Sequence, residues 1–220
     1  MIEINGLKFN LCGESNAAIV EMVVGRNLYQ LAAHLEGLQV IDIGAHVGSF
    51  SILAASRGAK VVAFEPTLQT FEILKENVLL NGQEKNITCH QLAIGMPGER
   101  KLYYDIGNGD GNRLEGSVTM YEQFKSQFPS QIVKTISLTE VINSYSSGHC
   151  DILKVDCEGI EYEMLDELLD DLHNKIDTIL IELHEKTHAR NFINKLRSFY
   201  YVDCLDAPGE KAEEWRLVKI

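Results

Sequence analysis

The fold is decided by the stretch VIDIGAHVGSF at residues 40–50. It begins with an apolar run that contains an acid, Asp42. Two glycines, Gly44 and Gly48, then bracket a short turn, and a second apolar run follows. This order predicts a buried strand, a tight turn and a helix. Glycines let a ligand approach the bare backbone of such a turn, and the start of the helix offers free N–H groups to an anion.

The spacing of these glycines distinguishes between two kinds of cofactor. Dinucleotide-binding turns have the pattern G-x-G-x-x-G, whose middle glycine leaves room for a pyrophosphate, whereas this turn has G-x-x-x-G with His46 near that place. The acid before the turn would also repel a pyrophosphate. A cofactor with an ammonium group and a carboxylate fits better, because Asp42 can attract the ammonium, directly or through water, and backbone N–H groups can hold the carboxylate. The turn therefore favours S-adenosylmethionine, and a tight turn without a ligand is the alternative.

A second acid follows the next apolar run, AKVVAFEP at residues 59–66. Glu65 ends this run, and Pro66 stops the strand because proline has no N–H to donate to a sheet. Glu65 stands about 20 residues beyond the turn, where dinucleotide folds place the acid that binds the ribose. A carboxylate can accept hydrogen bonds from both ribose hydroxyls. We therefore expect Glu65 to bind the ribose of the cofactor, with an exposed acid at a strand end as the alternative.

Apolar strand-like runs alternate with helical patterns along most of the chain. We expect strands at residues 40–43, 60–64, 87–93, 151–155 and 178–183, and helices at residues 48–57, 68–80, 160–172 and 187–198. Strands that are apolar on both faces and separated by helices predict a doubly wound, mostly parallel sheet. Two further β-like runs, at residues 201–205 and 215–220, flank Pro208 and Gly209, so we expect an antiparallel hairpin at the end of the sheet.

The N-terminal segment and one insertion depart from this rhythm. Residues 1–38 begin with a hairpin around Asn5 and Gly6 and continue with two expected short helices between residues 15 and 35. We interpret them as a cap on the site, and residues 39–220 as the main domain of a single structural unit. At residues 105–131 we expect loops that cover the ligand site and select the acceptor. Four aromatic side chains there could line an acceptor pocket or pack in the core: Tyr103, Tyr104, Tyr121 and Phe124.

Charged residues end the strand expected at residues 151–155. Lys154 and Asp156 alternate with apolar neighbours, so both side chains point to one face of the sheet. Charges in such a strand are costly unless they are paired or used, so we expect this pair beside the reactive end of the cofactor, with a structural ion pair as the alternative. Glu158 and Glu161 begin the next helix, where acids also interact favourably with the helix dipole.

The following strand ends in Glu182 and His184, which share one face by alternation. Methyl transfer to oxygen requires an aligned acceptor and the removal of its proton. Histidine titrates in the right range, so we expect His184 to act as general base, with Asp156 or Glu182 as its orienting partner. A strand-end histidine bonded to a loop is the alternative. Asp156, Glu182 and His184 could also bind a divalent metal ion.

Several of these segments occur in the order and spacing of a known family. Residues 40–50, 63–66, 76–82, 93–95 and 153–161 resemble the FkbM-type S-adenosylmethionine-dependent methyltransferases, and LKVDCEGIE at residues 153–161 is the most diagnostic segment. The resemblance implies a class I methyltransferase fold with a seven-stranded, Rossmann-like sheet, and methyl transfer to a hydroxyl oxygen of a small metabolite or sugar. It also implies which residues contact the cofactor: Asp42, Gly44, Ala45, His46, Gly48, Phe50, Glu65, Pro66, Ala93, Asp156 and Glu158. The catalytic residues that we expect beside them are Lys154, Asp156, Glu182 and His184.

Composition argues against several other classes of protein. The chain of 220 residues suits one α/β domain, and its formal net charge of −12 disfavours nucleic acid as a partner. Five cysteines without a C-x-x-C motif indicate free thiols rather than a zinc site or disulfides. Without a secretory leader or an apolar stretch of membrane-spanning length, we expect a cytoplasmic protein that binds no membrane. Its oligomeric state stays open.

Other functions remain open at this point. The methyl group could go to a nitrogen, or to a ribose of RNA, although the sequence has no clear second lysine to complete a ribose-methylating set with Lys154, Asp156 and Glu182. A cofactor-binding regulatory protein is an alternative outside the enzymes, and the intact polar strand ends argue against it.

Overall fold

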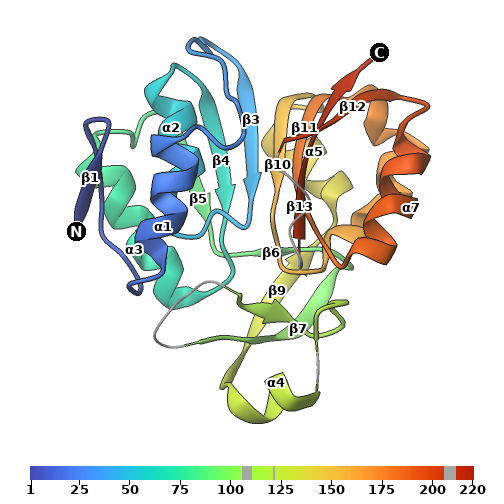
Figure 1. Cartoon of the computed structure of the whole chain (residues 1–220), viewed down its shortest axis with the longest axis horizontal. Coiled ribbons are helices and arrows are strands. Elements are labelled where there is room, and N and C mark those ends of the chain that lie inside the picture. The colour runs from blue at the N-terminus through green and yellow to red at the C-terminus, as the bar shows by residue number, and fades with distance from the viewer. Residues whose placement is uncertain (106–110, 121, 206–211) are drawn as a thin grey trace.

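A central sheet of seven strands carries the fold. Its strands are β3 (Gln39–Ile43), β4 (Lys60–Phe64), β5 (Ile87–His90), β10 (Cys150–Val155), β11 (Ile176–His184), β12 (Tyr200–Cys204) and β13 (Ala212–Lys219). In this computed structural model, which describes residues 1–105, 111–120, 122–205 and 212–220, they lie in the order β12-β13-β11-β10-β3-β4-β5 (Figure 1). Neighbouring strands from β11 to β5 are parallel, and β13 is antiparallel to β11 and β12. The mostly parallel sheet with a terminal antiparallel hairpin is confirmed, and Pro208 and Gly209 lie outside the described residues.

Two separate apolar cores cover the faces of this sheet. The helices that contribute to these two cores are α1 (Asn16–Val20), α2 (Ser49–Ser56), α3 (Leu68–Leu80), α5 (Leu138–Tyr145), α6 (Leu165–Asp170) and α7 (Lys186–Leu196). In β3, Val40 belongs to the core that contains residues of α1, α2 and α3, whereas its neighbour Ile41 belongs to the core with α5, α6 and α7. Burial on both faces explains why the strands read as continuous apolar runs.

The N-terminal segment confirms one expectation and corrects another. The hairpin around Asn5 and Gly6 is formed by β1 (Ile2–Ile4) and β2 (Leu7–Phe9). α1 continues directly into a π-helical turn, Glu21–Gly25, but residues 27–35 form an irregular segment with one turn at Leu28 and Tyr29 instead of a second helix. Asn27 has a positive φ of 54°, and its side chain exchanges two hydrogen bonds with the backbone of Leu31. Such local side-chain bonds compete with helical bonding.

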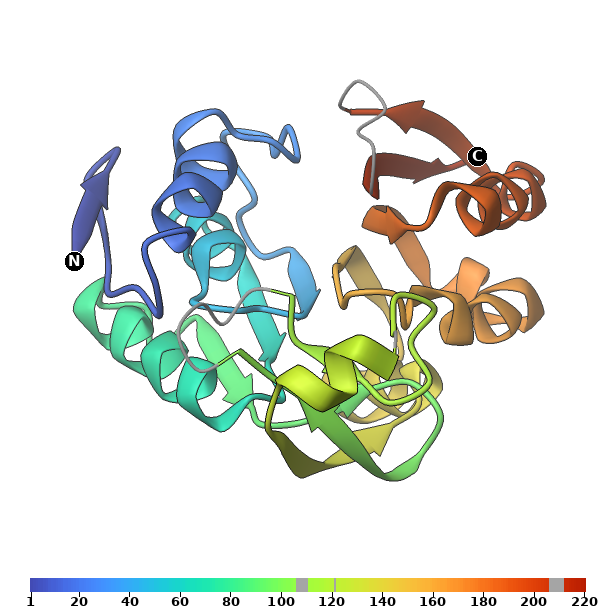
Figure 2. The same cartoon turned by 60° about the horizontal axis from the view of Figure 1, so that its bottom comes forward.

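A second, smaller sheet lies around the insertion, whose expected loops are interrupted by short strand segments and one helix. The strand expected at residues 87–93 ends at His90, and the chain then enters a sheet with the order β6-β9-β7-β8. These strands are β6 (Ala93–Ile94), β7 (Gly98–Tyr103), β8 (Arg113–Leu114) and β9 (Ser130–Ile136), with α4 (Glu122–Gln127) before β9. Figure 1 shows this sheet below the carboxyl ends of β3 and β4, and Figure 2 brings it toward the viewer. Residues 106–110 and 121 lie outside the described residues.

Two further expectations concern the state of the cysteines and the presence of membrane-spanning segments. All five cysteines are free thiols. Within the described ranges, every helix is too short or too polar to cross a membrane.

Candidate active site

A cavity of about 1020 Å³ opens where the parallel strands end. In open α/β sheets, ligands bind at this edge. Most of the residues expected from the sequence line it: Gly44, Ala45, His46, Phe50, Glu65, Pro66, Ala93, Lys154, Asp156, Glu158, Glu182 and His184. Asp42 and Gly48 are absent from the described lining. The sheet therefore brings motifs from distant parts of the sequence to a single cavity.

The glycines of the turn are required by close backbone packing. Gly44 has a φ of +74°, and a Cβ added there would lie 1.8 Å from the carbonyl oxygen of Asp156. Gly48 has a φ of +90°, and its added Cβ would lie 2.6 Å from Cδ1 of Leu74. His46, between them, also has a left-handed φ of 53°. Gly44 thus keeps the turn against the end of β10, whereas Gly48 packs the helix start against α3.

Glu65 connects the two loops expected to hold the cofactor. Its Oε2 accepts a hydrogen bond from the backbone N–H of His46 at 3.0 Å, and its Oε1 accepts one from the N–H of Thr67 at 2.8 Å. The side chain lines the cavity although the residue is only 6% exposed. Burial raises the pKa of Glu65 to about 7, against the opposing effect of these N–H groups and of Lys154. Each carboxylate oxygen keeps a second lone pair for a further donor.

Asp42 lies beneath the turn in a buried ion pair. Its Oδ2 accepts a hydrogen bond from Oγ of Ser51 at 2.6 Å, and its Oδ1 lies 3.3 Å from Nζ of Lys154. Lys154 also donates to the carbonyl of Gly44 at 2.9 Å and lies 3.6 Å from Oδ2 of Asp156. Burial lowers the pKa of Lys154, but the carboxylates of Asp42 and Asp156 outweigh it and hold that pKa above its usual range. The structural ion pair considered in the sequence analysis is therefore present, and its closer partner is Asp42.

His184 is surrounded by carboxylates. Its Nδ1 lies 3.0 Å from Oε1 of Glu161, and its Nε2 lies 3.5 Å from Oε2 of Glu158 and 3.7 Å from Oε1 of Glu182. Burial lowers the pKa of His184, but the bonds to Glu158 and Glu161 outweigh it and raise that pKa to about 12. Both ring nitrogens therefore face carboxylate oxygens, and this arrangement favours the protonated ring. The expected role of His184 as general base stays a prediction.

Glu182 has a different environment on the same strand. The carboxylate of Asp156, followed by burial, raises its pKa well above the usual range. Both carboxylates line the cavity. Two like charges that share a site favour holding one proton between them.

Glu161 contacts the site, although from the sequence it was expected only as an acid at the start of a helix. The helix expected at residues 160–172 begins instead with a 3₁₀ turn, Glu161–Met164, before α6. Glu161 is 0% exposed, and its Oε1 accepts a hydrogen bond from the backbone N–H of Cys157 at 3.0 Å as well as meeting His184. Beyond the motif LKVDCEGIE, the sequence carries no signal for the contact between Glu161 and His184, because His184 lies on a separate element, at the end of β11.

Apolar side chains from two segments complete the wall. The N-terminal segment contributes Ile19, Met22, Val23, Leu28 and Tyr29, and the insertion contributes Phe124 and Phe128. The ring of Tyr29 meets that of Phe50 edge to face at 5.3 Å, and the guanidinium of Arg113 lies over the Phe124 ring at 4.3 Å. Tyr103 and Tyr104 are absent from the described lining, and Tyr121 lies outside the described residues. An apolar wall thus faces an acidic one.

The insertion is attached to the loop that follows β10. The hydroxyls of Ser117 and Thr119 both donate to the carbonyl of Glu158, which has a left-handed φ of 56°. Arg100 on β7 also pairs with Glu163 at 2.7 Å. The small sheet therefore holds the loop that presents Asp156 and Glu158 to the cavity.

Comparisons with known proteins agree with this arrangement. A family model described as the methyltransferase FkbM domain matches residues 42–214. Methyltransferase 1 of Beauveria bassiana is 25% identical over 173 residues, which cover 70% of this chain and 68% of that protein. The hexuronic acid methyltransferase AglP of Haloferax volcanii is 26% identical over 169 residues, which cover 71% of this chain and 60% of that protein.

Solved structures show the same fold at low identity. A precorrin-6y C5,15-methyltransferase from Geobacter metallireducens superposes with a TM-score of 0.52 at 13% identity, covering 100% of this chain and 94% of that one. An rRNA methylase from Streptococcus thermophilus reaches 0.53 at 11% identity, covering 88% of this chain and 92% of that one. The α/β fold with its seven-stranded mixed sheet is that of the class I methyltransferases.

Proposed function

Since the chain belongs to the FkbM family of methyltransferases, we propose that it transfers a methyl group from S-adenosylmethionine to a hydroxyl oxygen of a small metabolite or sugar. The observation that carries this proposal is one cavity that joins the Gly44 turn and Glu65 to the carboxylates around His184. A cofactor can occupy the first part and an acceptor the second. The sugar class is supported by the relative named as a hexuronic acid methyltransferase.

The residues of the first part fit S-adenosylmethionine. The turn residues Gly44, Ala45 and His46 line the cavity, and Glu65 presents its carboxylate to the same cavity. We propose that Glu65 binds the ribose hydroxyls, and that the backbone of the turn around Ala45 and His46 holds the aminocarboxylate. Asp42 acts through Lys154, which holds Asp156 at the end of β10. When bound, S-adenosylmethionine supplies an electrophilic methyl group.

We assign the proton acceptor to the carboxylates rather than to His184. The acceptor hydroxyl must lose its proton during the reaction. Both ring nitrogens of His184 face carboxylates, whereas Asp156 and Glu182 line the cavity. We propose that the Asp156–Glu182 pair, whose two carboxylates favour holding one proton between them, orients the hydroxyl and takes its proton. His184 is then a positioning cation that holds Glu158 and Glu182 in place.

A methyl-transfer screen tests the proposed function. The purified chain and labelled S-adenosylmethionine are incubated with a metabolite extract and with a panel of sugars, and products are resolved by mass. The expected product is a metabolite or sugar heavier by one methyl group and stable to conditions that cleave esters. Labelled products that carry the methyl group on nitrogen, or in added RNA, would overturn the proposed acceptor class. Glu72→Gln, an exposed change on α3, serves as the control variant.

A further inference from the structure

Two groups of side chains in the described part of the chain have the composition of a metal site. One contains His149, Asp151 and Asp177, and the other contains Asp156, Glu161 and His184. In each group, one ligand atom per residue lies within 4.8 Å of the others. They differ in their surroundings, and this difference decides between them.

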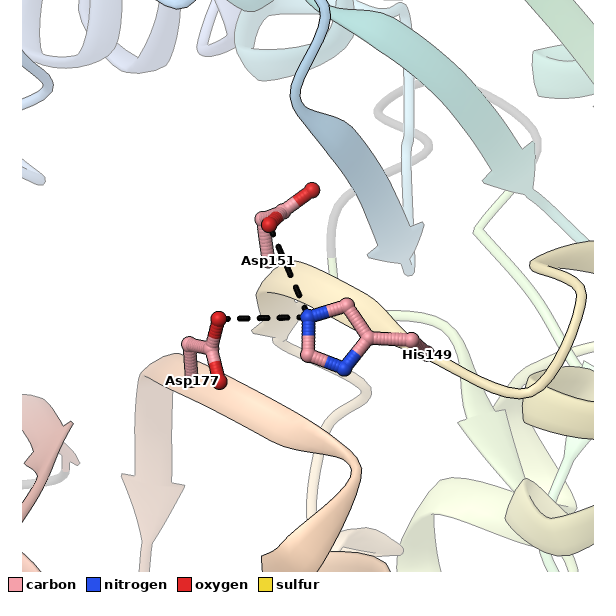
Figure 3. A group of neighbouring side chains, drawn as sticks. All are labelled: His149, Asp151 and Asp177. Carbon is pink, nitrogen blue, oxygen red and sulfur yellow. Dashed lines mark hydrogen bonds and ion pairs between the residues drawn. The ribbon is translucent and has the colours of Figure 1, made fainter.

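The first group lies on the surface at the amino ends of β10 and β11. Figure 3 shows the carboxylates of Asp151 and Asp177 pointing to the same ring nitrogen of His149, at 3.6 and 3.2 Å. The exposed fraction of the side chain is 49% for His149, 26% for Asp151 and 48% for Asp177. Oδ2 of Asp151 also accepts from the backbone N–H of Gln39 at 2.6 Å. Water and these neighbours satisfy the carboxylates, so nothing in this group requires an ion.

The second group is buried and contains a polar atom that lacks a partner. Oε1 of Glu161 accepts hydrogen bonds from Cys157 and His184, but its Oε2 is buried without a hydrogen-bond partner among the described residues. A buried carboxylate oxygen without a partner costs free energy. Glu161 is fully buried directly behind the wall, whereas Asp156 and His184 line the cavity. A cation at this point would satisfy the oxygen and still face the acceptor.

The charge around this group also favours a cation. Glu158, Glu182 and Glu214 line the same cavity. The ammonium of Lys154 is already held between Asp42 and Asp156. Among the described residues, the carboxylates at this end of the cavity therefore outnumber the nearby positive groups, and their mutual repulsion is unfavourable. A divalent ion would offset two of these charges.

We propose that Asp156, Glu161 and His184 bind a divalent metal ion, and that this ion holds the hydroxyl oxygens of the acceptor. The role at the acceptor rests on the proposed function, whereas the binding of the ion does not. The two carboxylates suit a hard divalent ion such as Mn²⁺, with the imidazole as a further ligand, and oxygen atoms of water or of a sugar complete its coordination. As a Lewis acid the ion lowers the pKa of the bound hydroxyl, whose proton passes to Glu182.

Titration with Mn²⁺ followed by electron paramagnetic resonance tests the site. The spectrum of free Mn²⁺ loses intensity when the ion binds, so the whole chain titrated with Mn²⁺ alone reports affinity and stoichiometry. We expect one ion per chain, and a loss of affinity on the order of 10–100-fold or more in both Glu161→Gln and Asp156→Asn. Asp177→Asn, the matched change in the surface group, should bind the ion as the unchanged chain does. Absence of binding, or loss in Asp177→Asn with full binding in Glu161→Gln, would overturn the proposal.

Two further readouts separate this inference from the proposed function. Circular dichroism and a thermal unfolding midpoint close to that of the unchanged chain, both measured in the presence of a chelator, should show that Glu161→Gln is folded. If Mn²⁺ binds but no acceptor is methylated, the metal site stands and the proposed function fails. If methyl transfer proceeds fully in a chelator, the role of the ion at the acceptor is wrong.

Discussion

Nζ of Lys154 on β10 lies 3.3 Å from Oδ1 of Asp42 on the neighbouring strand β3, and their side chains are 4% and 0% exposed. This buried pair joins the turn motif to the carboxyl end of β10, since Lys154 also holds Asp156 and the carbonyl of Gly44. The position of Asp156 at the proposed reactive end of the cavity thus depends on Lys154, and through Lys154 on Asp42, which is absent from the described lining.

Lys154→Met should strongly destabilise the protein. The change leaves Asp42 buried without its cation, which costs about 3–5 kcal/mol when one partner of a buried pair is removed. Urea unfolding measures this loss, and Lys75→Met, on an exposed pair with Glu72, should cost no more than about 1 kcal/mol. Changing Asp42→Asn together with Lys154→Met should recover part of the stability. Equal stability of the two single lysine variants would show that the pair is not buried as described.

Gly44→Ala should lose both stability and cofactor binding. Its Cβ would meet the Asp156 carbonyl at 1.8 Å, so the turn has to move away from β10. Gly37→Ala is a matched control, because Gly37 has nearly the same φ, +76°, with nothing within 4 Å of an added Cβ. It should show only the left-handed strain of about 1–2 kcal/mol. Thermal unfolding and calorimetry with S-adenosylmethionine compare the two, and a Gly44→Ala chain that behaves like Gly37→Ala would contradict the packing described.

Glu65 should make the stability of the protein depend on pH. Its pKa is about 7 in the folded chain and near 4.5 when unfolded, so between these values the folded state keeps a proton that the unfolded state releases. The free energy of unfolding should therefore fall as pH rises through this window, by at most about 3 kcal/mol. Glu65→Gln removes this contribution, and urea unfolding at several pH values should show a shallower dependence. An unchanged slope would mean that Glu65 does not titrate there.

The hydroxyls of Ser117 and Thr119 should stabilise the loop that carries Glu158. Replacing both by alanine removes two hydrogen bonds to the Glu158 carbonyl, whose residue has a left-handed φ. Hydrogen exchange of the amides at residues 156–160 should become faster, because local opening then costs less free energy. Ser126→Ala is the control, since that hydroxyl bonds only within α4. If the amides of the loop exchange as in the control, the small sheet does not hold this loop.

Local patterns were sufficient to predict the central sheet, but contacts between distant segments were not predictable. The apolar run before Asp42 predicts a buried strand, and Glu65 predicts the end of the next strand, because strand burial and strand ends are visible in the local sequence. The small sheet was missed because β6 has two residues and its partner β9 lies far along the chain. The protonation of His184 depends on Glu158 and Glu161, which another loop supplies. Likewise, the sequence shows that Asp42 is acidic but not that Ser51 and Lys154 enclose it.

Calorimetric titration of the chain with S-adenosylmethionine tests the central claim most directly. We predict binding of one molecule per chain. In Glu65→Ala, binding should weaken on the order of 100-fold, since two hydrogen bonds to a charged acceptor are lost at about 1.5 kcal/mol each. Glu72→Gln should leave the affinity unchanged. Absence of binding to the unchanged chain, or equal affinity of Glu65→Ala and Glu72→Gln, would contradict the assignment of this cavity to the cofactor.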